Sequence, residues 1–600
     1  MLSRCLFIFA CLGSTFVFGA TPGLPIPDVV APRLADAVRP LEPGSVHVAG
    51  WLGGRIDQNV ANRLAVVDTV PLLAGFKQKP GSHPWIGEHV GKWLHAATLA
   101  WAYTGDEALR RKLDGVVAEL IATQEPDGYL GTYVPGKRLG MYEGADWDVW
   151  SHKYNLLGLL TYYRYTGSEP ALQASRRMAD LLIATFPAVR SINAAGNHQG
   201  MAATSVLEPI VLLYRLTGDE RYLAFARYIV TAYDEAGGPG IVHTLLTRKD
   251  ASHTANGKAY EMLSNLVGLC EYARCTGDRP ILEAVGNAWT DIVANRLYLT
   301  GATSAYEHFT YDHELPNGND AHVGETCATV TWIQLNLQLL RLTGDPAYAD
   351  ELERSLYNHL TAAQHPAGAD WCYFTALEGV KQYDKDITCC HSSGPRGLAL
   401  APTFAFLQTD AALCVNTFES ARAKFIVNGT PVELAQESAF PRAGHAKLTV
   451  HVPQAARFAL RFRVPEWAAP LQVGGQSYAA GWAELPARDW RDGDALDLTF
   501  TLQGRAVRGD YTNYSRTAFT WGPFVLAADA TRNGKLSALP ELRLARDVPP
   551  VLVAGAGAAL AFTAKVRGPW DDTPRDLIMQ PFADTGAAGE QYRIWFRTDQ

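Results

Sequence analysis

Three cysteines and two glutamates are the residues whose types and spacing best suit chemistry. Glu325 and Cys327 lie two positions apart, and the adjacent pair Cys389 and Cys390 follows much later in the chain. One carboxylate and three thiols form a ligand set suited to zinc, which binds thiolate sulfur and carboxylate oxygen in tetrahedral geometry. Glu307 supplies a second carboxylate for proton transfer. These residue types predict a catalytic zinc–thiolate site.

The spacing leaves other interpretations of the cysteines open. Common structural zinc modules use paired C-x-x-C hooks, which this pattern lacks. Buried structural cysteines and disulfides are the alternatives, although adjacent cysteines rarely bridge each other because the geometry is strained. Glu325 and Cys327 can converge where the chain enters a helix near Ala328. Cys389 and Cys390 can converge if a polar loop turns both side chains toward one ion.

The first 20 residues have the pattern of a secretory signal. Arg4 precedes a short apolar run from Cys5 to Phe18, and the small residues Gly19 and Ala20 follow. This combination is typical of a removed leader, and the run is too short for a permanent membrane anchor; a buried first helix is the alternative. We therefore expect an exported protein, periplasmic or extracellular, without a membrane span.

Removal of that leader leaves seven of the nine cysteines. An odd number cannot all pair in disulfides, and unprotected thiols are lost in an oxidising compartment. Coordination to a metal is one way to keep three of them reduced. The cysteine count therefore agrees with the zinc interpretation.

The composition is that of an ordinary globular protein with at least two domains. A chain of 600 residues exceeds the size of a single core, and 48% hydrophobic with 19% charged residues is typical of folded proteins. The net charge of −8 is modest and the chain has no basic run, so we expect no nucleic-acid partner. The 15 Trp and 25 Tyr residues suit sugar binding and protein cores equally.

Five Thr-Gly dipeptides that stand before Asp or Ser punctuate the first two thirds of the chain. Each follows an apolar helical run and precedes Asp or Ser. Gly favours the left-handed conformation that ends a helix, and Asp or Ser caps the next one. The five glycines lie 62, 51, 59 and 67 residues apart, about one helical hairpin per interval. The repeat predicts a helical array over residues 21–404, which we expect to close into an (α/α)6 toroid; an open solenoid is the alternative.

From about residue 405 the pattern changes to alternating apolar and polar residues. Segments such as Phe458–Val464 and Leu496–Leu502 alternate in this way, and turns rich in Gly, Pro and Asp separate them. This pattern predicts antiparallel sheet. We therefore expect a multidomain α + β protein in which residues 405–600 form a β-sandwich region with a structural role. Two small β domains are the alternative division of this region.

The chain resembles glycoside hydrolase family 127 and its relative family 146, the β-L-arabinofuranosidase group, over nearly all residues after the leader. The strongest matches are Glu307-His-Phe, Leu315-Pro-Asn, Glu325-Thr-Cys327, Leu356-Tyr-Asn358 and Cys389-Cys390, with weaker ones in residues 124–133, 521–523 and 580–584. The resemblance implies retaining glycoside hydrolysis with a cysteine nucleophile. Glycans are therefore the expected partners.

The resemblance also implies a role for each residue of the site. Glu325, Cys327, Cys389 and Cys390 match the zinc ligands, Cys389 also matches the nucleophile, and Glu307 matches the general acid/base. Zinc would keep the thiol ionised at neutral pH, so that Cys389 could attack the anomeric carbon. Glu307 would protonate the leaving oxygen and then activate water. Sulfur here replaces one carboxylate of the usual glycosidase pair.

Further residues have weaker matches to the sugar pocket of the family. We expect substrate contact from three residues, with core packing as the alternative for each: His152, His253 and Tyr373. Trp85 and Glu88 form a candidate rim of the pocket. His391, directly after the cysteine pair, is a candidate for orienting the metal ligands.

The chain departs from the family near the sugar and not at the metal. Lys153 stands where an acidic residue is usual, and an unusual segment, residues 391–396, follows Cys390.

We therefore expect an exported, zinc-dependent exo-glycosidase that releases terminal L-arabinofuranose, or a similar sugar, from plant or algal glycans. A lyase or epimerase on the same toroid is one alternative, although it would need no thiols. A non-catalytic carbohydrate-binding protein with structural zinc is another.

Overall fold

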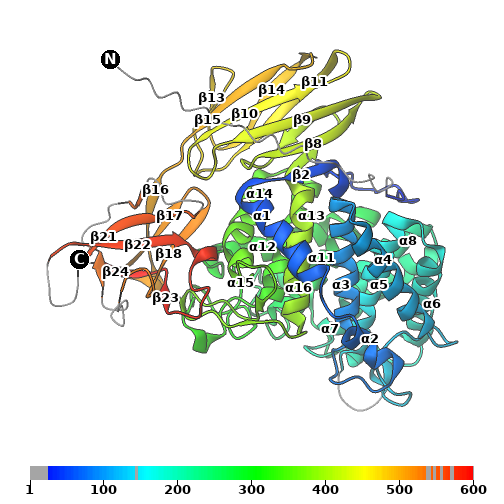
Figure 1. Ribbon diagram of the computed structural model, residues 1–600. Coiled ribbons are helices and arrows are strands. Elements are labelled where there is room, and N and C mark those ends of the chain that lie inside the picture. Colours follow the sequence, from blue (N-terminus) through cyan, green and yellow to red (C-terminus); the bar gives the residue numbers. More distant parts are fainter. Residues whose placement is uncertain are drawn as a thin grey trace, which may run out of the picture.

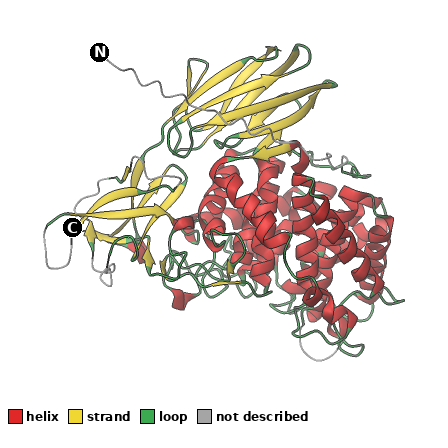
Figure 2. Ribbon diagram, in the orientation of Figure 1, coloured by secondary structure: helices red, strands yellow, loops and turns green. Residues whose placement is uncertain are grey.

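The computed structural model describes residues 25–141, 146–534, 542–544, 549–553, 559–567 and 573–598. A helical part lies beside two β parts, one built from β6–β15 and the other from β16–β24 (Figure 1, Figure 2). The predicted leader, residues 1–20, lies outside the described residues. Within the described part of the chain, no helix combines the length and apolarity needed to cross a bilayer.

Six inner helices form a closed ring. They are α3 (Glu88–Thr104), α5 (Asp148–Thr166), α8 (Leu207–Thr217), α11 (Ala259–Thr276), α13 (Thr326–Thr343) and α16 (Cys389–Leu400). Each packs on the next, and α16 packs on α3. The predicted toroid is therefore confirmed, and the open solenoid is wrong.

Outer helices cover the ring. They are α1 (Gly50–Asn59), α4 (Glu107–Ala122), α6 (Glu169–Thr185), α9 (Glu220–Ala232), α12 (Arg279–Asn295) and α14 (Pro346–Arg354). All but two residues of α3 are buried, whereas α4 buries only five of its 16 residues, on one face. This difference explains why the inner runs are apolar on most sides and the outer ones are amphipathic.

The Thr-Gly turns end the inner helices as predicted. All five glycines are left-handed, with φ between 68° and 79°, and aspartates cap four of the helices that follow. Ser168 makes no capping hydrogen bond, so the prediction is wrong at that turn.

An extended segment, residues 25–38, crosses the carboxyl-terminal ends of four inner helices; we call it the strap. Its backbone N–H groups donate at 2.7–2.9 Å to arginine carbonyls that occupy one position of the helical repeat. The donor and acceptor pairs are Ile26 with Arg164, Val29 with Arg215, Arg33 with Arg274, and Ala37 with Arg341. The strap therefore satisfies carbonyls that have no partner within their own helix.

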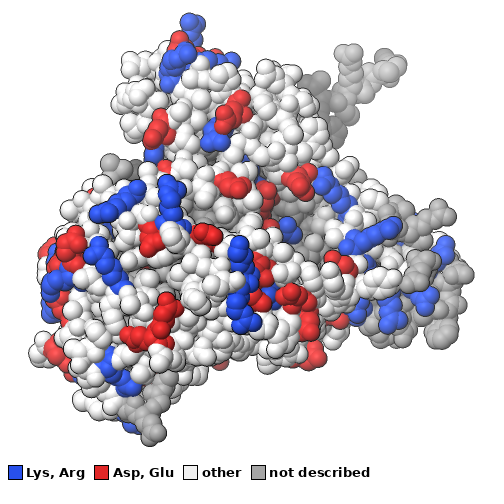
Figure 3. All heavy atoms as spheres, turned by 180° about the vertical axis from the view of Figure 1, so that it is seen from behind, with Lys and Arg blue, Asp and Glu red and all other residues white. Residues whose placement is uncertain are grey.

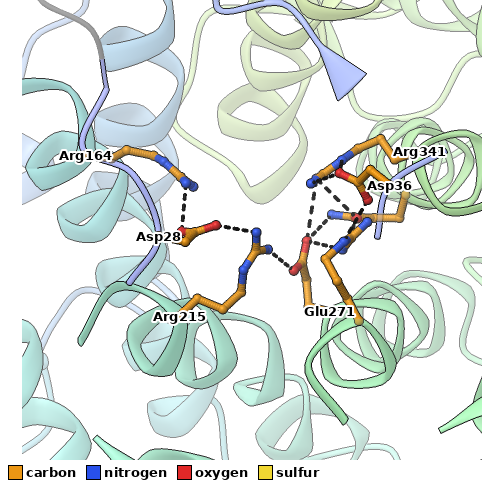
Figure 4. Close-up of polar contacts among 8 residues, drawn as sticks. Asp28, Asp36, Arg164, Arg215, Glu271 and Arg341 are labelled. Atoms are coloured by element: carbon orange, nitrogen blue, oxygen red, sulfur yellow. Dashed lines mark hydrogen bonds and ion pairs between the residues drawn. The ribbon is translucent and has the colours of Figure 1, made fainter. Parts of the chain in front are cut away.

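The strap is also held by ion pairs (Figure 4). Asp28 pairs with Arg164 at 2.8 Å and with Arg215. Asp36 pairs with Arg274 at 2.9 Å and Arg341 at 2.7 Å. Each aspartate thus links two neighbouring inner helices: Asp28 links α5 to α8, and Asp36 links α11 to α13.

The first β part is a two-sheet sandwich, as predicted. Its sheets have the strand orders β1-β6-β7-β11-β14 and β13-β12-β15-β10-β9-β8-β2. The strands are β1 (Arg39–Pro40), β2 (Val46–Val48), β6 (Phe406–Gln408), β7 (Ala412–Val415), β8 (Ala421–Val427), β9 (Thr430–Ser438), β10 (His445–His451), β11 (Ala456–Val464), β12 (Leu471–Val473), β13 (Gln476–Tyr478), β14 (Gly481–Trp490) and β15 (Ala495–Phe500). The segment after the strap supplies an edge strand to each sheet, which the pattern of the sequence did not predict.

The second β part is a small barrel and not a sandwich. Strand β17 pairs with both β18 and β24, and the order β24-β19-β21-β22-β18 closes the circuit. These strands are β17 (Arg516–Trp521), β18 (Phe524–Asp529), β19 (Arg543–Leu544), β21 (Phe562–Arg567), β22 (Arg575–Pro581) and β24 (Phe596–Thr598), preceded by β16 (Gly504–Arg508). Closure leaves few free strand edges. The β-rich region is therefore confirmed, with a barrel as its last part.

Two motifs noted in the sequence join the barrel to the helical part, outside the inner ring. The Asn358 side chain donates to the Pro523 carbonyl at 2.9 Å and accepts from the Val525 N–H at 2.7 Å. Asp584 accepts from the Trp51 ring at 3.2 Å and pairs with Arg55. On the face in Figure 3, acidic and basic side chains are interspersed over these parts.

Replacement of Asp36 tests the role of the strap. Asp36→Asn removes the charge that pairs with the buried Arg274 and the half-buried Arg341. We therefore expect the free energy of unfolding to fall by about 2–4 kcal/mol. Urea denaturation followed by helical circular dichroism measures this. The control Asp410→Asn breaks the exposed Arg39–Asp410 pair, and its effect should stay below about 1 kcal/mol. Equal losses in the free energy of unfolding for the two variants would contradict a stabilising role of the strap.

Candidate active site

All six inner helices begin at the face of the ring that lies opposite the strap. Side chains from the beginnings of α3, α5, α11, α13 and α16 line one cavity of about 230 Å³ there. Helix N-termini carry partial positive charge from their unpaired N–H groups. This face is therefore suited to anionic side chains.

The four predicted ligand residues lie together at two of these helix ends. Glu325 is the N-cap of α13 and Cys327 its second residue, while Cys389 and Cys390 begin α16. One ligand atom from each lies within 4.8 Å of the other three. Cys390 Sγ is 3.4 Å from Cys327 Sγ and 3.9 Å from Glu325 Oε1. The sequence thus predicted the whole cluster.

The cluster has the geometry and chemistry of a metal site. A tetrahedral ion with zinc–sulfur bonds of about 2.3 Å separates its sulfur ligands by about 3.8 Å, close to the spacing found. Glu325 Oε2 is buried without a hydrogen-bond partner, and a cation would satisfy it. The seven cysteines of the described part are free thiols, so the disulfide alternative is wrong for them.

The predicted polar loop at the cysteine pair is wrong, because Cys389 begins helix α16. The helix continues through Pro395, which cannot donate to the carbonyl of His391 one turn earlier. Arg63 Nη2 donates to that carbonyl instead, at 3.3 Å. Thr388 caps the helix by accepting from the His391 N–H at 3.3 Å. The helix end fixes the direction of both thiols.

A chain of hydrogen bonds joins Cys389 to Glu307. The thiol of Cys389 lies 3.1 Å from the Tyr373 hydroxyl, which donates to Glu307 Oε1 at 3.0 Å. The other oxygen of Glu307 pairs with the Lys258 ammonium. A thiol and a carboxyl group therefore face the same cavity, with one phenol hydroxyl between them.

Glu307 lies in a backbone conformation that side chains other than glycine rarely adopt. The N–H and carbonyl groups of Ala305 and His308 are paired at 3.1 and 2.9 Å, and the two residues between them, Tyr306 and Glu307, have φ of 51° and 63°. Both positive angles are features of a tight two-residue hairpin turn. Such outliers cost about 1–3 kcal/mol each and cluster at functional sites. The turn directs Glu307 into the cavity.

The three thiols differ in their tendency to ionise. Hydrogen bonds from Cys327 and Cys390 lower the pKa of Cys389 well below its usual value, against the effect of burial, and the buried Lys92 ammonium acts in the same direction. Burial raises the pKa of Cys327 and of Cys390. Cys389 is therefore the sulfur on which negative charge is best stabilised.

The cavity lining contains predicted residues and others that the sequence did not reveal. The predicted ones are Trp85, Glu88, Glu307, Glu325, Tyr373 and Cys389; the others are Trp147, Trp150, Lys258, Tyr260 and Glu261. All five of the latter occupy or directly precede the first turn of α5 or α11. The position of each at the start of an inner helix was a signal that could have identified them.

Glu88 is not at the rim but buried in the cavity wall. Its carboxylate accepts from Lys92 Nζ at 2.9 Å and from the Trp150 indole N–H. Trp85, by contrast, is 39% exposed and packs near Trp147. Only Trp85 therefore lies where a rim was predicted.

Two predicted substrate contacts lie away from the cavity lining. His152 is buried, with Nδ1 2.9 Å from the Asp148 carbonyl and its ring against Tyr129. His253 is partly exposed and pairs with Asp250 at 2.8 Å. Sugar contact by these histidines stays a prediction, whereas Tyr373 does line the cavity.

His391 lies directly beside the ligand cluster in the sequence, but its ring is directed elsewhere. Nδ1 is 2.9 Å from the Asp386 carbonyl, and Nε2 is buried without a partner. The ring borders a separate small cavity with His89. A role in orienting the metal ligands stays a prediction.

Comparison with known proteins agrees with this geometry. Residues 56–402 match the family model of the β-L-arabinofuranosidase GH127 catalytic domain, and residues 412–502 match that of the GH127 middle domain. The non-reducing end β-L-arabinofuranosidase of Bifidobacterium longum subsp. longum is 29% identical, with 80% of each chain covered.

Solved structures share the fold over nearly the whole chain. A GH127 β-arabinofuranosidase superposes with a TM-score of 0.80 at 22% identity, covering 94% of this chain and 99% of its own. A GH127 β-L-arabinofuranosidase from Geobacillus stearothermophilus T6 gives 0.76 at 22% identity, covering 92% and 100%. The family models cover more than half of the sequence, and the chain belongs to the GH127 β-L-arabinofuranosidase family.

Proposed function

We propose that the protein is an exported, zinc-dependent retaining exo-glycosidase that removes a terminal β-L-arabinofuranosyl group or a closely similar sugar. The observation that carries this proposal is the shared cavity, into which Cys389 and Glu307 both project with Tyr373 between them. Export rests on the apolar N-terminal run alone.

Zinc is the metal that the ligand set favours. Thiolates select soft or borderline ions, and four ligands of this kind suit the tetrahedral geometry of zinc. Glu325, Cys327, Cys389 and Cys390 would hold the ion. When bound, zinc would keep the thiol groups ionised at neutral pH.

The residues of the cavity support a two-step reaction. In the first step Cys389 Sγ bonds to the anomeric carbon while the bond to the leaving oxygen breaks, and Glu307 donates its proton to that oxygen. In the second step Glu307 takes a proton from water, the water oxygen bonds to the anomeric carbon, and the carbon–sulfur bond breaks. Two inversions give retention. Lys258 stabilises the carboxylate form of Glu307 between the steps.

The size of the cavity supports removal of single sugars. Pockets for drug-sized ligands measure about 300–1,000 Å³, and about 230 Å³ suits one sugar ring. The relative from Bifidobacterium longum acts at non-reducing ends according to its name. Lys153, one of the departures from the family, is buried against Trp150 and Tyr154 and changes the wall behind the cavity.

A structural metal in a non-catalytic protein is a weaker alternative. Structural zinc sites are closed, whereas catalytic ones keep a reachable position. Cys327 and Cys390 are fully buried, but Cys389 and Glu325 line the cavity. Two ligands are therefore within reach of a bound sugar.

Elemental analysis tests the metal. We expect about one zinc per chain in the wild type and a large loss in Cys327→Ser and Cys390→Ser, because each removes one of four ligands. Cys414→Ser, at a buried cysteine of β7, is the matched control and should retain the zinc. Full zinc content in the two ligand variants would contradict the assignment of the site.

Kinetics test the two catalytic residues. With 4-nitrophenyl β-L-arabinofuranoside, Cys389→Ser should lose activity by at least about 10⁴-fold, because the nucleophile is removed. Glu307→Gln should lose about 10²–10⁴-fold with alkyl glycosides, which need protonation of the leaving oxygen, and less in the first step with dinitrophenyl glycosides, which do not.

Two variants serve as controls for these measurements. Cys372→Ser changes another buried cysteine, and Glu314→Gln changes an exposed glutamate near Glu307 in the sequence. Both should keep near wild-type rates. A fully active Cys389→Ser enzyme would reject the nucleophile, and equal losses by Glu307→Gln on both kinds of glycoside would reject the acid.

A further inference from the structure

Most polar side chains that line the cavity already have partners in the protein. Glu88 accepts from Lys92 and Trp150, and the Tyr260 hydroxyl is bonded to that of Tyr154. Glu307 is paired with Lys258 and Tyr373, as described above. These groups can meet a ligand only by giving up or sharing an existing bond.

Glu261 is different. This residue, in the first turn of α11, lines the cavity and is only 2% exposed. Its Oε2 is buried and has no hydrogen-bond partner. A buried acceptor without a donor is destabilising, and more so if it is charged. The cavity therefore contains an acceptor that a ligand hydroxyl group would satisfy.

His198 is a neighbour of Glu261 but makes no hydrogen bond to it. The Asn256 amide nitrogen is 3.0 Å from His198 Nδ1 and donates to it, which leaves the ring proton on Nε2. Nε2 is 4.0 Å from Glu261 Oε1. Burial lowers the pKa of His198 to about 4, so the ring is neutral near pH 7. A neutral ring therefore lies beside the Glu261 carboxyl group, at a distance longer than a hydrogen bond. Burial raises the pKa of Glu261 itself to about 7.

We infer that Glu261 determines sugar specificity by accepting a hydrogen bond, through its free Oε2, from a hydroxyl group of the bound sugar. This inference rests on the proposed glycosidase function and names the sugar as a neutral one. Sites built to bind a substrate hydroxyl discriminate strongly against analogues that lack it, because the protein acceptor is then left unpaired. Glu261 is a binding residue and takes no part in the transfer of the sugar.

The charges of the cavity lining exclude acidic sugars. Among its described lining residues, Lys258 is the only lysine or arginine, and its ammonium is paired with Glu307. The proposed zinc would be outweighed in charge by its three thiolates and one carboxylate. The carboxylate of a uronic acid would therefore lie among glutamates without a free cation. Like charges placed together in a buried cavity repel each other strongly.

Deoxy sugars test the inference in the zinc-loaded enzyme. Glu261→Gln is compared with wild type on 4-nitrophenyl β-L-arabinofuranoside and on its 2-, 3- and 5-deoxy analogues. We expect kcat/KM on the parent glycoside to fall about 10- to 100-fold, mostly through KM. On the one analogue that lacks the hydroxyl bound by Glu261, the loss should be below about threefold. The control Glu351→Gln removes a buried carboxylate of α14 and should leave all rates unchanged.

Calorimetric binding separates this inference from the proposed function. L-arabinose, D-galactose, D-xylose and D-galacturonate are titrated into wild type and both variants. At least one neutral sugar should bind wild type and Glu351→Gln equally and Glu261→Gln about tenfold or more weakly, while galacturonate should not bind. This result would support the inference even if no arabinofuranoside were hydrolysed. Equal binding by Glu261→Gln, equal losses on every deoxy analogue, or binding of no neutral sugar by wild type would overturn it.

Discussion

The site depends on the parallel arrangement of the inner helices, whose positive ends meet at one face of the ring. Three thiols and a carboxylate lie at the beginnings of α13 and α16, where unpaired N–H groups and the helix dipoles stabilise negative charge. Burial alone would favour their neutral forms. The closed ring fixes both helix ends and so brings the four ligand atoms within 4.8 Å of one another.

At the opposite face of the ring, the groups that need partners are carbonyls. There the inner helices end in unpaired carbonyl groups, and the strap supplies N–H donors to four of them. Asp28 and Asp36 add charge next to arginines that the helical repeat places one turn from each helix end. The two faces therefore differ in kind: one is closed by backbone and ion pairs, and the other is left open for chemistry.

Local patterns in the sequence, together with the family resemblance, predicted the ring and the ligand cluster. The Thr-Gly turns depend on the conformation of single glycines, and the Glu-x-Cys and Cys-Cys pairs need only two helix ends to meet. Features that depend on distant residues were missed. The carbonyl left unpaired by Pro395 accepts from Arg63, which is distant in the sequence, and the barrel closes through very short strands. Lys258 and Glu261 reach the cavity only because α11 begins beside the turn that holds Glu307.

The path of the first residues has a consequence for the order in which the molecule is completed during synthesis. The strap is made early, yet its last partner, Arg341, follows about 300 residues later, and strands β1 and β2 must wait for β6 and β8. Contacts between residues so far apart in sequence form slowly. The strap therefore cannot complete its contacts before Arg341 has been synthesised, although its first partner, Arg164, is made much earlier.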